Sequence, residues 1–216
     1  MKALIWDMDG VIADSRLAHY RAWKELMEAQ GVTITYEQFA ATFGMNNWPI
    51  LKGWLGEDTP PEVLRDLADR KEALFRQYAA TEAKILPGVR EWLEWARRQG
   101  YRQAVASSGP MANIVALVMA MEIADYFDAL ISGAFWPRSK PNPAIFLQAA
   151  AALGAEPRHC VVLEDGVVGV EAARRAGMAC IAVTTTHPAE KLADADIVVE
   201  SLAELNAATI ERLLAP

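Results

Sequence analysis

Two aspartates stand directly behind the first apolar run of the chain. Residues 3–6 are apolar, Asp7 follows them, and Asp9 comes two positions later, just before Gly10. Two carboxylates this close raise each other's pKa, so burying them is costly unless a cation or a reaction uses the acids. A turn in which aspartate caps and glycine supplies the positive φ is the alternative. The spacing favours a metal-assisted acid site.

Three further polar clusters follow later apolar runs. They are Ser107-Ser108-Gly109, Ser139-Lys140-Pro141 and Glu164-Asp165-Gly166. Taken singly, the first is typical of a helix cap, the second of a solvated loop charge and the third of a turn. All four clusters nevertheless occur behind predicted strands, and ligands of open α/β sheets bind at the carboxyl ends of the strands. We therefore expect them to meet in one site.

The two aspartates have separate tasks in phosphoryl transfer. Asp7 can attack phosphorus and form an aspartyl phosphate, which divides a difficult displacement by water into two easier steps. Asp9 can protonate the leaving oxygen and then take the proton of the attacking water. We also expect both aspartates to be ligands of a magnesium ion.

The other clusters can offset the negative charge that a phosphate brings. Glu164 and Asp165 offer the oxygen ligands that Mg²⁺ prefers. Lys140 offers a fixed positive charge, and Ser107 and Ser108, with nearby backbone N–H groups, can bind the phosphoryl oxygens. The predicted cofactor is therefore Mg²⁺, and the predicted substrate is a small phosphorylated metabolite.

Six short β-rich runs would position these clusters. They are residues 3–6, 102–106, 129–132, 160–163, 180–183 and 197–199. Helical segments alternate with them, at 89–98, 144–153 and 167–176, with Pro, Asn or Gly at their starts and ends. This alternation predicts an α/β fold with a doubly wound parallel sheet covered on both faces. Cys160 and Cys180 fall within the runs, so we expect buried, inert thiols.

The stretch between Asp14 and Ala83 breaks the alternation. It contains only helical patterns, at residues 17–30, 36–43 and 61–78. We expect a core of residues 1–14 and 83–216 and an inserted helical cap of residues 15–82, lying over the carboxyl ends of the strands. Met45, Trp48 and Trp54 could contact a substrate from this cap, but packing among its helices is the favoured role.

Composition excludes several other classes of protein. The 216 residues are 53% hydrophobic, and 21 Lys+Arg against 28 Asp+Glu give a net charge of −7. Because the basic residues are scattered, a nucleic-acid partner is not expected. The apolar run before Asp7 is too short for a secretory signal, and no run reaches the ~20 residues that span a bilayer. We expect a cytoplasmic protein without a membrane partner; the oligomeric state stays open.

The four clusters resemble the four motifs of the haloacid dehalogenase (HAD) superfamily. The matching residues are Asp7-x-Asp9-Gly-Val, Ser107, Lys140-Pro141 and Glu164-Asp165. The similarity covers nearly the whole chain and is closest to the phosphatase and β-phosphoglucomutase branch, in which a helical cap follows the first motif. The resemblance implies a magnesium-dependent phosphatase acting on a sugar phosphate.

Two segments of the cap resemble β-phosphoglucomutase in particular. They are His19-Tyr-Arg-Ala-Trp-Lys24 and Arg70-Lys71. The resemblance implies that His19 helps to close the cap and position the general acid, and that Lys71 contacts the sugar phosphate. Without it, His19 would be interpreted as a residue on a helix face and Lys71 as a solvated charge.

The chain departs from the mutase pattern where a second phosphate would bind. Asn47 aligns with an arginine of the mutase cap, and Gly109, Pro110 and Met111 align with Ser, Lys and Asn after the second motif. None of the four offers a cation, and Pro110 has no N–H group. A mutase must hold a bisphosphate in two orientations, whereas a phosphatase needs one phosphate site. The departures favour a phosphatase, with β-phosphoglucomutase as the alternative.

Three other classes are less consistent with the residues. A signalling receiver domain also uses Asp, Lys and magnesium, but is near half this length and has its aspartate behind a middle strand. A catalytically inactive binding protein on the same fold would not need to retain every ionisable group. A dehalogenase would have no use for Asp9, Glu164 or magnesium.

Overall fold

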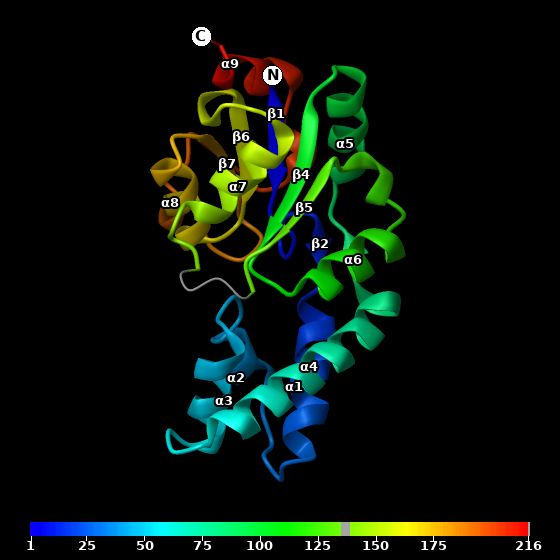
Figure 1. Ribbon diagram of the computed structural model, residues 1–216, viewed down its shortest axis with the longest axis vertical. Helices are drawn as coiled ribbons and strands as arrows, with labels where there is room; N and C mark the ends of the chain where they lie inside the picture. The colour runs from blue at the N-terminus through cyan, green and yellow to red at the C-terminus, as the bar shows by residue number, and fades with distance from the viewer. Residues whose placement is uncertain (135–138, 216) are drawn as a thin grey trace. The chain divides into compact units, whose positions relative to one another are not determined.

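The computed structural model describes residues 1–134 and 139–215 and divides the chain into two compact units. The α/β unit comprises Met1–Asp14 and Lys84–Pro216, and the helical unit comprises Ser15–Ala83 (Figure 1). The helical unit is thus an insertion in the sequence of the α/β unit.

A six-stranded sheet forms the centre of the α/β unit. In spatial order its strands are β5 (Ala129–Ser132), β4 (Arg102–Ser107), β1 (Ala3–Trp6), β6 (Cys160–Glu164), β7 (Ala179–Val183) and β8 (Ile197–Val199). All neighbouring pairs are parallel. The chain builds outward from β1 to one side and then from β6 to the other, so the strand order reverses between β1 and β6. Ligands of doubly wound sheets bind at the carboxyl ends of the strands at such a point.

Helices cover both faces of this sheet. On one face α7 (Ala144–Leu153) and α8 (Val167–Arg175) bury a core around Ile5, Phe146 and Val162. On the other face lie α5 (Val89–Arg98) and α6 (Met111–Ala120), as Figure 1 shows. The buried Gln103 side chain accepts a hydrogen bond from the Trp6 indole and donates to the Leu93 carbonyl of α5. The predicted doubly wound parallel fold is confirmed.

The remaining elements of this unit are short. They are the antiparallel pair β2 (Ala13–Asp14) and β3 (Lys84–Ile85), the 3₁₀ turns η1 (Ala124–Tyr126), η2 (Pro157–His159), η3 (Ala189–Lys191) and η4 (Leu202–Glu204), and helix α9 (Ala207–Leu213). Strands β4 and β6 run one residue beyond their predicted ends, so that Ser107 and Glu164 are the last residues of strands. Cys160 and Cys180 are buried free thiols, as predicted.

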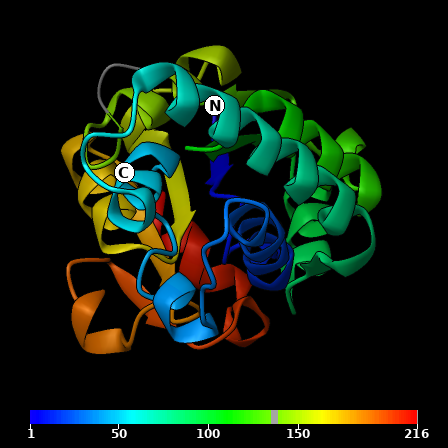
Figure 2. The ribbon, with the colours of Figure 1, turned by 90° about the horizontal axis from the view of Figure 1, so that it is seen from below.

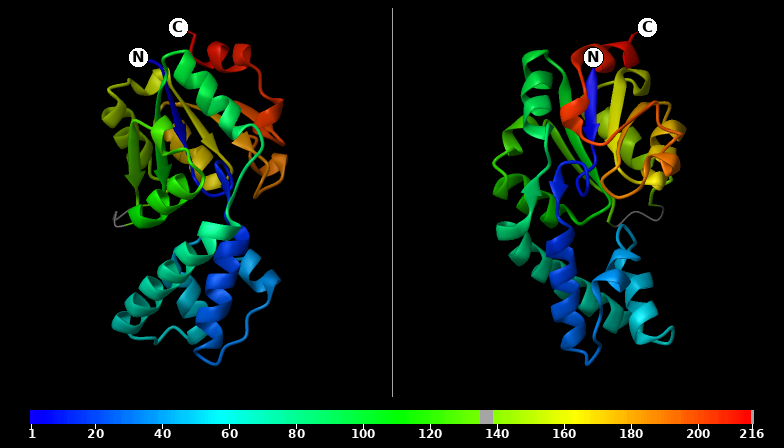
Figure 3. Two further views of the ribbon diagram at one scale, coloured as in Figure 1. Left: turned by 90° about the vertical axis from the view of Figure 1, so that its right-hand side faces the viewer. Right: turned by 180° about the vertical axis from the view of Figure 1, so that it is seen from behind.

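The helical unit contains α1 (Arg16–Glu28), α2 (Tyr36–Ala40), α3 (Asn47–Leu55) and α4 (Pro61–Glu82), drawn in blue to teal in Figure 2. Helices α1 and α4 lie side by side (Figure 3). All four helices contribute to one apolar core that includes Trp23, Phe39 and Leu51. Helix α3 has no counterpart among the predicted helices because Pro49 and Gly53 obscure it, although proline is tolerated in a first helical turn.

The three cap residues singled out for packing behave differently. Trp54 packs in the core of the helical unit, edge to face with Trp23 at 5.2 Å between ring centroids. Met45 and Trp48 are 51% and 41% exposed, so the prediction that they pack among the helices is wrong. Within the described part of the chain, no helix has both the length and the apolar character that a bilayer crossing requires.

Candidate active site

Asp7 stands where the strand order reverses. Its backbone N–H donates to the Leu163 carbonyl of β6 at 3.0 Å, and the residue is 8% exposed. The chain then turns sharply, because the Gly10 N–H donates to the Ala13 carbonyl at 2.8 Å with φ of +84° at Gly10. Asp9 pairs with Ala13 as an isolated bridge within this turn. The first motif is therefore a tight loop behind the central strand.

Lys140 connects the ends of three strands. Its Nζ lies 2.5 Å from Asp7 Oδ1 and 2.5 Å from Glu164 Oε1, and 3.5 Å from the Ala106 carbonyl oxygen of β4. Its side chain is only 7% exposed. The lysine is thus a buried cation shared between two carboxylates, and the interpretation as a solvated loop charge does not apply.

Glu164 is held in one orientation by its surroundings. Its Oε2 accepts the backbone N–H groups of Asp165 and Gly166, at 2.9 and 2.8 Å, while Oε1 faces Lys140. Gly169 in α8 makes room for it, because a Cβ on this glycine would lie 1.9 Å from the Glu164 carboxyl group. Both carboxylate oxygens therefore have hydrogen-bond donors inside the protein.

Asp165 is also confined. Its Oδ2 accepts a hydrogen bond from the Thr186 hydroxyl, and a Cβ on Gly10 would lie 1.9 Å from the same oxygen. The sequence analysis did not select Thr186. A signal was present, since Thr184-Thr185-Thr186 is a polar cluster directly behind β7, just as the other clusters follow strands.

Burial and mutual repulsion perturb these acids. Burial raises the pKa of Asp7 well above its usual value, Glu164 and Asp165 add to the increase, and Lys140 opposes it. Burial, followed by repulsion from Glu164, raises the pKa of Asp165 to about 7. Burial alone would lower the pKa of Lys140, but Asp7 and Glu164 together raise it. Lys140 is therefore charged, and it does not neutralise the group completely.

The acids fit a hard divalent cation. Asp7, Glu164 and Asp165 carry three negative charges when ionised, and Lys140 supplies one positive charge, so an added cation would relieve the remaining repulsion. Oxygen donors of this kind suit Mg²⁺, which usually keeps several waters and takes one or two carboxylates plus substrate phosphate. In residues 1–134 and 139–215 no group of three or more Asp, Glu, His or Cys side chains is arranged to hold a metal ion by itself.

Ser107 and Ser108 lie at the end of β4, beside β1. Ser107 is buried, and its Oγ accepts the Gly109 N–H at 3.1 Å, while the Gly109 carbonyl accepts from the Ser132 hydroxyl at 2.7 Å. Ser108 is exposed. The loop behind β4 is therefore ordered by its own hydrogen bonds.

His19 and Lys71 come together inside the helical unit. Lys71 Nζ lies 2.9 Å from His19 Nδ1 and 2.9 Å from Glu72 Oε1, and the His19 ring stacks on Phe75 at 3.9 Å. Lys71 is 2% exposed, so the interpretation as a solvated charge is wrong. Asn47 Nδ2 donates to the same Glu72 oxygen at 2.7 Å.

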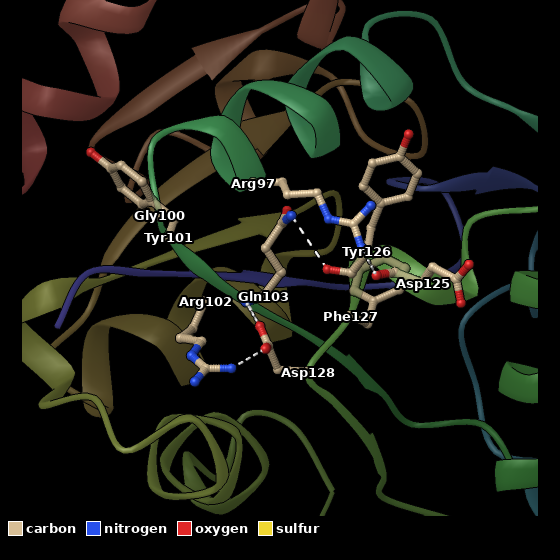
Figure 4. A pocket seen from close by; sticks show the side chains of 9 residues that line it. All are labelled: Arg97, Gly100, Tyr101, Arg102, Gln103, Asp125, Tyr126, Phe127 and Asp128. Atoms are coloured by element: carbon tan, nitrogen blue, oxygen red, sulfur yellow. Dashed lines mark hydrogen bonds and ion pairs between the residues drawn. The ribbon is translucent and has the colours of Figure 1, made fainter.

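A cavity of about 240 Å³ lies elsewhere, where β4 and β5 begin (Figure 4). Arg102 pairs with Asp128 beside it, and the Asp128 carboxylate also accepts the Gln103 N–H at 2.9 Å. Because this cavity is at the amino ends of the strands, it is separate from the cluster around Asp7.

Comparisons with known proteins identify the family of this chain. A family model described as haloacid dehalogenase-like hydrolase matches residues 1–177. Hexitol phosphatase B of Escherichia coli K12 is 33% identical over 214 residues, covering 95% of this chain and 94% of the relative. Protein SUPPRESSOR OF QUENCHING 1, chloroplastic, of Arabidopsis thaliana is 34% identical over 199 residues, which cover 90% of this chain but 19% of that protein.

A crystal structure of β-phosphoglucomutase from Clostridium difficile superposes with a TM-score of 0.85 at 26% identity, covering 99% of this chain and 97% of the other. The resemblance of the sequence motifs to the HAD superfamily is thereby confirmed. The chain belongs to the haloacid dehalogenase-like hydrolase family.

Proposed function

We propose that this protein is a magnesium-dependent phosphatase that releases inorganic phosphate from a small sugar phosphate through an aspartyl phosphate on Asp7. The observation that carries the proposal is the buried bridge of Lys140 between Asp7 and Glu164, with Asp165 next to it, at the reversal of the strand order. The similarity to a hexitol phosphatase supports a phosphorylated polyol or sugar as the substrate class.

The two aspartates share the chemistry. The Asp7 carboxylate attacks phosphorus, and Lys140 favours the ionised form that this attack needs. Asp9 gives a proton to the leaving oxygen and accepts one from the water that later hydrolyses the aspartyl phosphate. Asp9 belongs to the same tight loop as Asp7, which fixes the spacing of the two groups along the backbone.

The other residues would bind the magnesium ion and the phosphoryl group. Asp7 and Asp165 would hold magnesium, with Asp9 as a further ligand, and the bound ion would offset the negative charge of the phosphate. Glu164 contributes through Lys140, because both of its oxygens already accept hydrogen bonds. Ser107, Ser108 and nearby N–H groups would hold the phosphoryl oxygens.

The helical unit supports a phosphatase more than a mutase. His19 and Lys71 are the residues that we propose act on the substrate from this unit. Asn47, which aligns with the phosphate-binding arginine of the mutase, donates to Glu72 at 2.7 Å instead. Pro110 and Met111, at the start of α6, are uncharged residues and offer no cation. At these aligned positions, all within the described residues, no cation is present to anchor a second phosphate.

The test supplies β-glucose 1-phosphate with a trace of β-glucose 1,6-bisphosphate, beside a panel of other sugar phosphates. A phosphatase accumulates inorganic phosphate, because water reaches the aspartyl phosphate before a loosely held bisphosphate can reorient. Conversion to glucose 6-phosphate much faster than phosphate release would favour the mutase. No turnover of any substrate with magnesium would favour an inactive binding protein.

A further inference from the structure

Thr186 is a residue outside the four motifs that contacts the acid site directly. It stands three residues after the end of β7, and its hydroxyl donates to Asp165 Oδ2. The parallel register pairs Glu164 with Ala182, so the segments behind β6 and β7 leave the sheet side by side. Adjacent strands therefore bring the hydroxyl to the carboxylate.

Asp165 needs such a partner because its neighbours repel it. The residue is 6% exposed, and Glu164 and Asp9 both act on it as like charges. A carboxylate side chain has a broad terminal torsion, so repulsion without a hydrogen bond would rotate it away from the other acids. The Thr186 hydroxyl opposes that rotation.

Gly10 also lies against the same oxygen. A Cβ at Gly10 would lie 1.9 Å from Asp165 Oδ2 and 3.1 Å from Thr186 Oγ1. The space between the first-motif loop and the threonine is thus filled by one carboxylate oxygen. The contact with Gly10 and the hydrogen bond from Thr186 together restrict the rotation of the carboxylate.

We infer that Thr186 is a positioning residue for magnesium: by holding Asp165 Oδ2, it keeps the carboxylate in its binding orientation before the ion arrives. The inference rests on the proposed function, in which Asp165 is a metal ligand. Groups that orient metal ligands typically change metal affinity about 10- to 100-fold when they are removed. The effect should appear without substrate, because the contact lies entirely within the protein.

The experiment titrates Mg²⁺ into the metal-free full chain by calorimetry. Thr186→Val keeps the shape and loses the donor, so it should bind Mg²⁺ about 10- to 100-fold more weakly than the unaltered protein. Thr186→Ser keeps a hydroxyl and should restore affinity. Thr184→Val is the matched control, because Thr184 lies in the same segment and its backbone N–H bonds to the Val199 carbonyl; its affinity should be unchanged.

Urea unfolding of all four proteins in EDTA separates positioning from folding. Equal unfolding free energies with weaker Mg²⁺ binding by Thr186→Val support the inference. Equal Mg²⁺ affinities of Thr186→Val and the unaltered protein overturn it and leave the proposed function standing. If the valine variant does not fold, the serine variant is compared with an Asp165→Asn protein. A folded serine variant that binds Mg²⁺ as weakly as Asp165→Asn overturns the inference. Absence of Mg²⁺ binding by the unaltered protein overturns both proposals.

Discussion

Replacement of Lys140 by methionine removes the bridging ammonium and keeps most of the side chain's length. The side chains of Lys140, Asp7 and Glu164 are 7%, 12% and 4% exposed, and both ion pairs measure 2.5 Å. Removing one partner of a buried ion pair costs about 3–5 kcal/mol, because the other charge stays buried without compensation. We expect a loss of that order in the free energy of unfolding near pH 8 in EDTA.

The loss should depend on pH in a defined direction. Lys140 lowers the pKa of Asp7 against the effect of burial, so the pKa rises further in the variant. The folded variant then keeps a proton that the unfolded chain has lost, and each such proton lowers stability by about 1.4 kcal/mol per unit of rising pH. This proton stabilises the folded variant at low pH, and its contribution is lost as the pH rises through the raised pKa of Asp7 in the folded state. Between about pH 8 and pH 6 the penalty should therefore shrink.

Urea unfolding followed by tryptophan fluorescence at both pH values measures these differences. Lys191→Met is the matched control, because Lys191 is exposed at the end of η3 and should cost little. A Lys140→Met protein as stable as the unaltered protein near pH 8 would refute the reasoning. So would a penalty that is the same at the two pH values.

Three further predictions concern the glycine in α8, the metal requirement and the pH profile. Gly169→Ala should displace Glu164 and destabilise the protein by about 1–3 kcal/mol. The control Gly53→Ala in α3 adds a Cβ into open space, so it should be neutral or stabilise the protein by up to about 1 kcal/mol. Equal effects of the two substitutions in urea unfolding would contradict this prediction. Phosphate release should stop in EDTA, return with Mg²⁺ and be inhibited by Ca²⁺. At limiting Mg²⁺ it should also fall as pH decreases below about 7, the pKa of Asp165, and saturating Mg²⁺ should shift that limb to lower pH. If the pH profile were the same at limiting and saturating Mg²⁺, Asp165 would be excluded as a metal ligand.

The sequence predicted the sheet and its acid edge because both depend on local patterns. Apolar runs and helical periodicity identify the strands and helices, and polar residues directly behind a strand must lie at its carboxyl end. Helix α3 escaped prediction because Pro49 and Gly53 are read as breaks, although tertiary packing in the helical unit overrides them. The pair β2 and β3 escaped because two-residue strands carry no periodicity.

Contacts between residues that are distant in the sequence could not be predicted from local patterns. Glu164 is a predicted metal ligand whose carboxylate also faces Lys140, and Gly169 gives it the necessary space. Thr186 meets Asp165 only because β6 and β7 are neighbours in the sheet. Such roles depend on strand order and side-chain orientation, which residue types alone do not determine.

The most direct test of the central claim, that Asp7 is the nucleophile, is p-nitrophenyl phosphate turnover by Asp7→Asn in magnesium. The asparagine keeps the shape and loses the nucleophile, so activity should fall by more than the ~10² to 10⁴ expected for a general acid or base, because the covalent route disappears. Asp194→Asn, an exposed aspartate of the same unit, should retain full activity. An Asp7→Asn protein that hydrolyses the substrate within tenfold of the unaltered rate would contradict the account.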